Sequence, residues 1–322
     1  MTFSLKHLVL AGNHLPAALL AMALLAASGA VGIAAISQRL ALSRRKVFYD
    51  KFARQIARMG VLWGTLATVA ACATAFVWAT RPGLLHLMPS TLPKALTGAP
   101  ALWLPAAAAL VCGLALAAIH LALWPRMKNA RSLHSLCGGA ARLTSLAAAF
   151  GLLGLARLVY GDMPVPDGGA MARLAAVYAA PLASPLWPLL AQAVLLSCGA
   201  AAALGLGYLL LRRNSEDFGR DYYTFCLHYC AKWACITTLL QLVAQGWLFA
   251  LLRPSMGAVA LTNPAYALWG MAVAATLAAC LLWGAVIKSH TPLRHKAAIA
   301  LAPALLLVAI ACQGTALLYT LI

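Results

Sequence analysis

Long apolar runs alternate with short basic segments along the whole chain. A bilayer core of about 30 Å needs about 20 apolar helical residues to cross it. Eight runs reach that length, at 15–37, 59–80, 101–124, 137–160, 188–211, 231–252, 266–287 and 297–321. Each can satisfy its backbone hydrogen bonds within one helix, as lipid requires of a spanning segment. The pattern therefore predicts an all-α, polytopic membrane protein with eight transmembrane helices.

Composition agrees with this pattern and also indicates which kind of partner to expect. Of the 322 residues, 64% are hydrophobic and 9% are charged, whereas soluble domains carry about 25% charged residues. The net charge of +18 would suit nucleic-acid binding, but the cations lie in the short segments between apolar runs. Topology and attraction to anionic headgroups explain them better. We therefore expect membrane lipid as a partner and no nucleic acid.

The distribution of basic residues also predicts an orientation. Most of the 24 Lys and Arg residues follow the first, third, fifth and seventh runs, and we count Arg142 with this side. Short basic loops stay in the cytoplasm. The first run is too long for a cleaved signal peptide and leads into a basic loop, so we expect it to be retained. The prediction is a multi-pass protein of the bacterial inner (plasma) membrane with both termini periplasmic.

The two halves of the chain resemble each other. The stretch 49–82 is similar to 222–254, each with an amphipathic basic entry, one apolar run and a closing Arg-Pro. Pro16 and Pro188 open the first and fifth runs. Four spans return the chain to the same side, so the halves would be parallel. We predict two tandem four-helix membrane units, residues 1–165 and 166–322.

Few polar side chains fall inside the predicted spans. All six acidic residues lie in loops or near span ends. Proton pumps and cation-coupled transporters usually rely on a membrane-embedded carboxylate. A small-solute transporter is therefore the weaker alternative.

Histidine and arginine are the remaining candidates for chemistry. His14 lies at the outer mouth of the first span, and His120 and His134 lie near the cytoplasmic ends of the third and fourth. Histidine is a common haem ligand, and its ring can hydrogen-bond a quinone carbonyl. Arg157 and Met163 close the fourth span on the same outer side as His14, where they can line a quinone pocket. Each of these side chains also has a structural explanation, as an interfacial or internally hydrogen-bonded group.

Four motifs occur in order in the first half of the chain. They are His14 followed by Pro16, the basic segment 49–54 before a span with Gly60 and Gly64, Trp124 with a basic loop and His134, and Tyr160-Gly-Asp-Met163-Pro164. With these motifs the first half resembles the haem-carrying subunit of cytochrome bd-type quinol oxidases. The resemblance implies haem b as a cofactor, with His14 as the metal ligand. It also implies an architecture of two four-helix units.

The chain departs from that family in three places. Leu189, Leu190 and Gln192 occupy the region of the fifth span where the family places its low-spin haem ligand. The membrane glutamates that serve the oxygen-reducing haem are missing, and segment 253–265 is too short for the family's quinol-binding loop. We therefore expect a divergent relative that does not reduce oxygen.

A second family has a similar shape. The chain also resembles the eight-span, haem-free anchors of molybdenum and iron–sulfur reductases, which exchange electrons with quinone. Both resemblances imply a non-autonomous subunit of a quinone-linked oxidoreductase in a respiratory electron-transfer complex, partnered by a cytochrome or an iron–sulfur protein. The expected cofactors are quinone, haem b or both, and the candidate cofactor-binding residues are His14, His120, His134, Arg157 and Met163. The alternative is a cofactor-free membrane scaffold or anchor.

Overall fold

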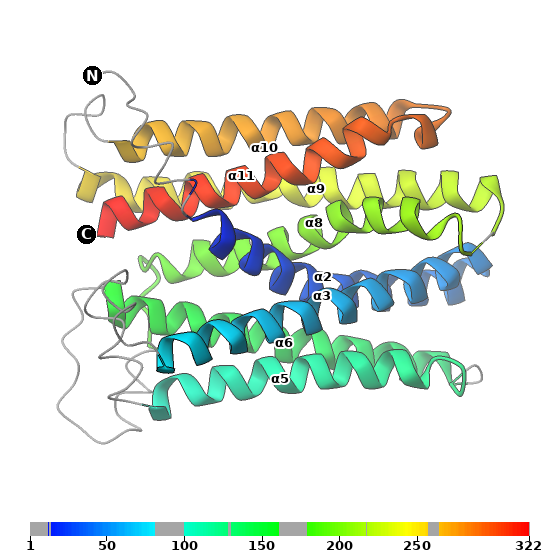
Figure 1. Cartoon of the computed structure of the whole chain (residues 1–322), viewed down its shortest axis with the longest axis horizontal. Helices are drawn as coiled ribbons and strands as arrows, with labels where there is room; N and C mark the ends of the chain where they lie inside the picture. Colours follow the sequence, from blue (N-terminus) through cyan, green and yellow to red (C-terminus); the bar gives the residue numbers. More distant parts are fainter. Residues whose placement is uncertain are drawn as a thin grey trace.

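Eight long helices make up most of the structure (Figure 1). The computed structural model describes residues 12, 14–80, 100–127, 130–160, 179–216, 218–256 and 264–321. The helices are α2 (Leu15–Arg44), α3 (Val47–Thr80), α5 (Pro100–Leu123), α6 (Arg131–Tyr160), α8 (Leu186–Arg212), α9 (Arg220–Leu252), α10 (Pro264–Lys288) and α11 (Lys296–Leu321). All eight are long and apolar enough to span a membrane, and the described ranges contain no strand. The prediction of an all-α, polytopic membrane protein is confirmed.

Several helices begin earlier than the apolar runs do. Helix α3 begins at Val47 and not at 59, and α9 begins at Arg220 and not at 231. The added turns of α3 are amphipathic, because Phe52 and Ile56 are fully buried while Lys51 and Arg54, which are good helix formers, occupy neighbouring positions and are less buried. A search for continuous apolar runs does not detect such amphipathic turns. The helices therefore extend past the hydrocarbon region at their basic ends.

The basic loops gather at one end of the bundle. The short connections α2–α3, α5–α6, α8–α9 and α10–α11 all lie at the same end, on the right of Figure 1. Helix α11 ends at the opposite side, toward the left. The basic loops therefore share one end of the bundle, while the side of the membrane that this end faces stays a prediction.

Helices α2 and α8 form the centre of the molecule. They pack against each other; α3 and α6 flank α2, α9 flanks α8, and α11 contacts both. Their backbones come very close, because a Cβ atom added at Gly29 would lie 1.9 Å from the carbonyl oxygen of Ser197. Only glycine at this position lets the two helices approach so closely.

Packing relations in one half recur in the other. Helix α2 packs on α3 as α8 packs on α9, and α5 packs on α6 as α10 packs on α11. One buried core nevertheless runs through both halves, with Met22 and Phe52 from the first and Leu206 and Trp283 from the second. The boundary predicted at 165 falls outside the described residues, so the division into two units stays a prediction.

The outward faces of the helices are apolar. Large side chains such as Leu143 (69% exposed), Val243 (73%) and Leu281 (75%) have no protein covering them. Water would penalise so much exposed apolar surface, whereas lipid tails accept it. The protein is a multi-pass integral membrane protein whose helices contact lipid.

Candidate functional site

The predicted site residues fall at two ends of the molecule. His14 precedes α2, and its Nδ1 lies 3.3 Å from Thr315 Oγ1 on α11. His120 and His134 lie together near the basic end, on α5 and α6. Met163 lies outside the described residues, and Arg157 belongs to α6 but its side chain is outside the described part. The structure therefore brings together two of the five candidates.

The two histidine rings stack on each other. Their centroids are 4.0 Å apart with 15° between the ring planes, and Trp124 contacts both rings edge-on. His120 is fully buried, and neither of its ring nitrogens has a hydrogen-bond partner among the described residues. His134 is also buried, but both of its ring nitrogens are engaged. The pair thus contains one satisfied imidazole and one unsatisfied imidazole.

His134 closes the end of the neighbouring helix. Its Nε2 lies 2.7 Å from the backbone oxygen of His120, in the last turn of α5, where carbonyls lack helical partners. The amide of Trp124 bonds to Leu121 instead. The other ring nitrogen, Nδ1, lies 2.6 Å from Nε2 of the buried Gln38 on α2. His134 therefore joins three helices through hydrogen bonds.

The packing around His120 bears on haem binding. A Cβ atom at Gly138 would lie 3.1 Å from His120 Cε1 and 3.2 Å from Nε2. Helix α6 thus lies directly against the nitrogen that would ligate iron, and His134 covers one ring face. A porphyrin needs open space at the ligating nitrogen, so these residues do not fit a haem at His120. Among the described residues, no three His, Cys, Asp or Glu side chains form a candidate metal site.

Replacing each histidine in turn by leucine should distinguish their contributions to stability. His134→Leu should lower the free energy of unfolding by about 2 kcal/mol. The reason is that the Gln38 amide and the His120 carbonyl would lose their hydrogen-bond partner while still buried. His120→Leu should change it by less than about 1 kcal/mol, because the ring makes no hydrogen bond and leucine has a similar volume. Unfolding by SDS titration, followed by circular dichroism, measures both values. Equal losses in the two variants would contradict this assignment.

One arginine lies inside a span, and its guanidinium forms hydrogen bonds toward the interior of the protein. Arg142 follows the start of α6 by 11 residues, or about 16 Å. Its guanidinium donates to Ser28 Oγ on α2 at 2.7 Å, and to Ser197 Oγ at 2.7 Å and the Val194 carbonyl at 3.1 Å on α8. Gly32 makes room for the side chain, since a Cβ there would lie 3.3 Å from Arg142 Cδ. The side chain therefore reaches the α2–α8 crossing and does not snorkel to the interface.

This location corrects the count of basic residues on the cytoplasmic side. We assigned Arg142 to that side, yet it bonds to serines near the middle of α2 and α8. No carboxylate among the described residues forms an ion pair with it. An ionisable group at this depth is by default a candidate for function. The sequence carried a sign of it, because Arg142 interrupts the apolar run 137–160.

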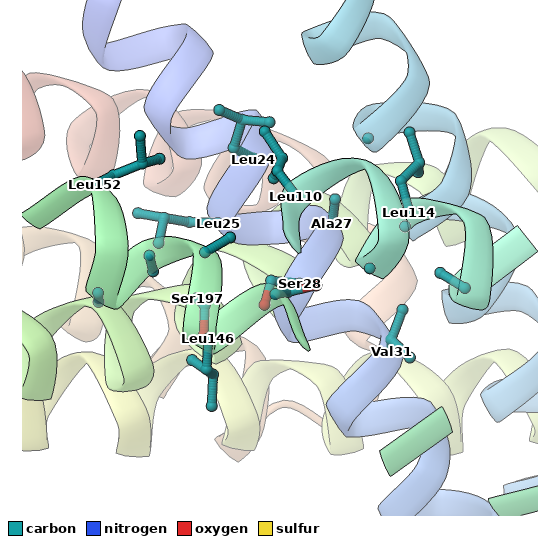
Figure 2. A pocket seen from close by; sticks show the side chains of 18 of the residues that line it. Leu24, Leu25, Ala27, Ser28, Val31, Leu110, Leu114, Leu146, Leu152 and Ser197 are labelled. Atoms are coloured by element: carbon teal, nitrogen blue, oxygen red, sulfur yellow. The ribbon is translucent and has the colours of Figure 1, made fainter. Parts of the chain in front are cut away.

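An apolar cavity lies beside the two serines (Figure 2). It has a volume of about 290 Å³ and lies between α2, α3, α5, α6 and α8. Figure 2 shows the leucines that surround it, among them Leu24, Leu110 and Leu152, with the hydroxyl oxygens of Ser28 and Ser197 at one wall. The other polar side chains in its lining, Thr68 and Ser145, donate to carbonyls of their own helices.

Ser28 differs from the other hydroxyl groups of this cavity. Ser197 donates its proton to the Val194 carbonyl at 2.6 Å, as Thr68 and Ser145 donate to carbonyls in α3 and α6. Ser28 Oγ accepts from Arg142 and has no acceptor for its own proton among the described residues. The cavity therefore offers a ligand one hydroxyl donor, polarised by a guanidinium, inside an apolar enclosure. This is the usual make-up of a small-molecule site.

No protein-family model matches the sequence, and a search of curated proteins finds no match. The geometry of Arg142, Ser28 and the apolar cavity therefore carries the functional argument for this integral membrane protein.

Proposed function

We propose that the protein is the quinone-binding membrane subunit of a respiratory electron-transfer complex, with the quinone in the cavity beside Ser28 and Ser197. The observation that carries the proposal is the polarised hydroxyl of Ser28, held by Arg142 at 2.7 Å, on the wall of an otherwise apolar cavity. Electrons would come from a cytochrome or iron–sulfur partner.

The cavity matches the chemistry of a quinone. A quinone has a flat ring with two carbonyl acceptors and an apolar isoprenoid tail. Ser28 can donate to one carbonyl oxygen, while leucine and alanine side chains enclose the ring or the first part of the tail. The volume of about 290 Å³ is at the lower end for ligand pockets, so the rest of the tail would extend toward lipid.

Arg142 supports electron transfer to the bound molecule. Reduction of a quinone takes up two electrons and two protons, and its carbonyl oxygens gain electron density. A positive charge in a low-dielectric site strongly stabilises the negative charge that the carbonyl oxygens gain. Because Arg142 has no carboxylate partner among the described residues, its charge remains available to the cavity through Ser28.

A serine substitution tests the site directly. Ser28→Ala should weaken binding of a short-tail quinone by about tenfold, because one hydrogen bond inside an apolar cavity is lost. Ser43→Ala is the matched control, since Ser43 is an exposed serine of the same helix whose hydroxyl bonds only to Leu40. Titration of the purified protein, with extraction and chromatography of co-purifying quinone, gives the measurement. Equal binding by both variants would contradict the proposal.

An absorption spectrum of the same preparation separates quinone from haem. A quinone-only subunit shows no reduced b-type band. A b-type band that disappears in His14→Ala would instead support haem ligation by His14. A preparation with neither quinone nor haem would overturn the proposal in favour of a cofactor-free scaffold.

A further inference from the structure

A groove lies between the end of α8 and the start of α11. It has a volume of about 500 Å³ and is formed by residues from 207–214 and from 296–300. Gly207, Leu210 and Leu211 line it from α8, and their spacing places them on one side of that helix. The groove adjoins the α8–α9 and α10–α11 connections, at the end of the bundle that carries the basic loops (Figure 1).

The walls of this α8–α11 groove are apolar, and the groove opens to lipid. Ile299 is 1% exposed and belongs to the protein core, whereas Leu211 is 80% exposed. A Cβ atom at Gly207 would meet nothing within 4 Å, so no side chain fills the space beside this glycine. Gly207 precedes the last residue of α8 by five positions, or about 7.5 Å. The groove therefore extends from the basic end into the hydrocarbon region, where an acyl chain can lie in it.

Two cations lie at the basic end of the groove. Arg213 directly follows α8, and Lys296 is the first residue of α11. Both are exposed, and neither forms an ion pair among the described residues. Arg212 is not counted with them, because its guanidinium donates to the Tyr208 hydroxyl. None of the described residues that line the groove is acidic, so the two positive charges have no compensation there.

The groove and its cations together match one class of molecule. An anionic phospholipid has an apolar chain, a phosphate and a net negative charge at the level of the helix ends. A free phosphate ion would use the cations but leave the apolar walls without a ligand. A zwitterionic headgroup would bring a positive charge of its own toward Arg213 and Lys296. The charge complementarity therefore favours a lipid with a net negative headgroup.

We propose that the α8–α11 groove binds one anionic phospholipid. Its phosphate contacts Arg213 and Lys296, and one acyl chain lies along Gly207 and Ile299. The bound lipid thereby joins the end of α8 to the start of α11. The site is separate from the quinone cavity, which α8 lines farther along the helix, at Ser197, so it does not depend on the proposed function.

Removal of the two charges tests the headgroup part of the site, on the full chain in detergent. The unfolding temperature is measured against short-chain phosphatidylglycerol, short-chain phosphatidylcholine and inorganic phosphate. Arg213→Gln/Lys296→Gln should need about thirtyfold more phosphatidylglycerol for the same shift, because each cation near a headgroup contributes about fivefold. The control Lys46→Gln/Arg126→Gln removes the same charges from exposed residues at the same end, outside the groove, and should behave like wild type.

Filling the groove tests the acyl-chain part of the site. Gly207→Leu should weaken the response to phosphatidylglycerol about threefold, because the new side chain occupies the place of the acyl chain and removes its dispersion contacts. All charges stay in this variant. Gly284→Leu is the matched control, since Gly284 lies four residues from the basic end of α10 and a Cβ atom there also meets nothing within 4 Å. It should respond like wild type.

The three ligands distinguish the occupants of the groove. The proposal expects a large shift with phosphatidylglycerol, a smaller one with phosphatidylcholine and little with inorganic phosphate. An equal shift with inorganic phosphate would indicate a free-anion site, and an equal shift with phosphatidylcholine would show that the cations do not select the lipid; either result overturns the proposal. Arg213→Gln alone, at an exposed position, should weaken the response about fivefold if the double variant does not fold. Equal behaviour of the two charge pairs or of the two leucine variants, or no response in wild type, would also overturn it.

Discussion

Gly29→Ala should lower the free energy of unfolding by about 3 kcal/mol, the largest effect that we expect from a single methyl group in this protein. The new Cβ would lie 1.9 Å from the Ser197 carbonyl oxygen and 2.8 Å from the Cys198 nitrogen. These are backbone atoms and cannot rotate away. Helices α2 and α8 would have to separate, and Ser28 and Ser197 would move apart with them.

A second glycine provides the control for this prediction. A Cβ atom at Gly246 in α9 would meet nothing within 4 Å. Gly246→Ala should therefore leave stability unchanged or raise it by up to about 1 kcal/mol, because alanine is the better helix former. SDS titrations of both variants, followed by circular dichroism, give the comparison. Similar stabilities would show that the α2–α8 crossing is looser than the structure indicates.

Arg142→Met should weaken quinone binding by about tenfold, as Ser28→Ala does, because the Ser28 hydroxyl would lose the guanidinium that orients and polarises it. Its free energy of unfolding should change by no more than about 1.5 kcal/mol. The variant loses three hydrogen bonds, each worth about 0.6 kcal/mol between membrane helices. It also removes an arginine whose placement at mid-span costs about 3 kcal/mol, and the two effects nearly offset.

Two measurements on Arg142→Met distinguish a role in quinone binding from a role in the stability of the fold. Quinone titration reports the site, and SDS unfolding reports the fold. Arg142→Lys keeps the charge but cannot reach Ser28 and Ser197 with the same fork of donors, so it should bind quinone at an intermediate affinity. A stability loss of several kcal/mol with unchanged binding would make Arg142 a structural clamp.

The sequence predicted the number and type of the elements because hydropathy is a local property. Each span can be recognised from about 20 residues without reference to any other. The ends were less well predicted, since the first turns of α3 and α9 bury only one face. Val47 and Arg220 begin these helices well before the apolar runs.

The candidate site was harder to predict. The sequence indicated that His120 and His134 lie near the same end, but their stacking depends on how α5 packs against α6. It did not reveal that His134 caps α5, because the carbonyl that it bonds belongs to another helix. Arg142 was counted with the cytoplasmic side, although its partners lie near the middle of α2 and α8.

The amino-acid sequence by itself determined eight spans, the end at which the basic loops lie and the scarcity of intramembrane acids. Only the tertiary structure decided that α2 and α8 form the centre, that Arg142 reaches Ser28 and Ser197, and that a cavity opens beside them. The physical reason is that lipid and protein interiors are equally apolar, so hydropathy does not distinguish a buried helix face from a lipid-facing one. That choice depends on close packing between small residues far apart in the chain, as at Gly29 and Ser197.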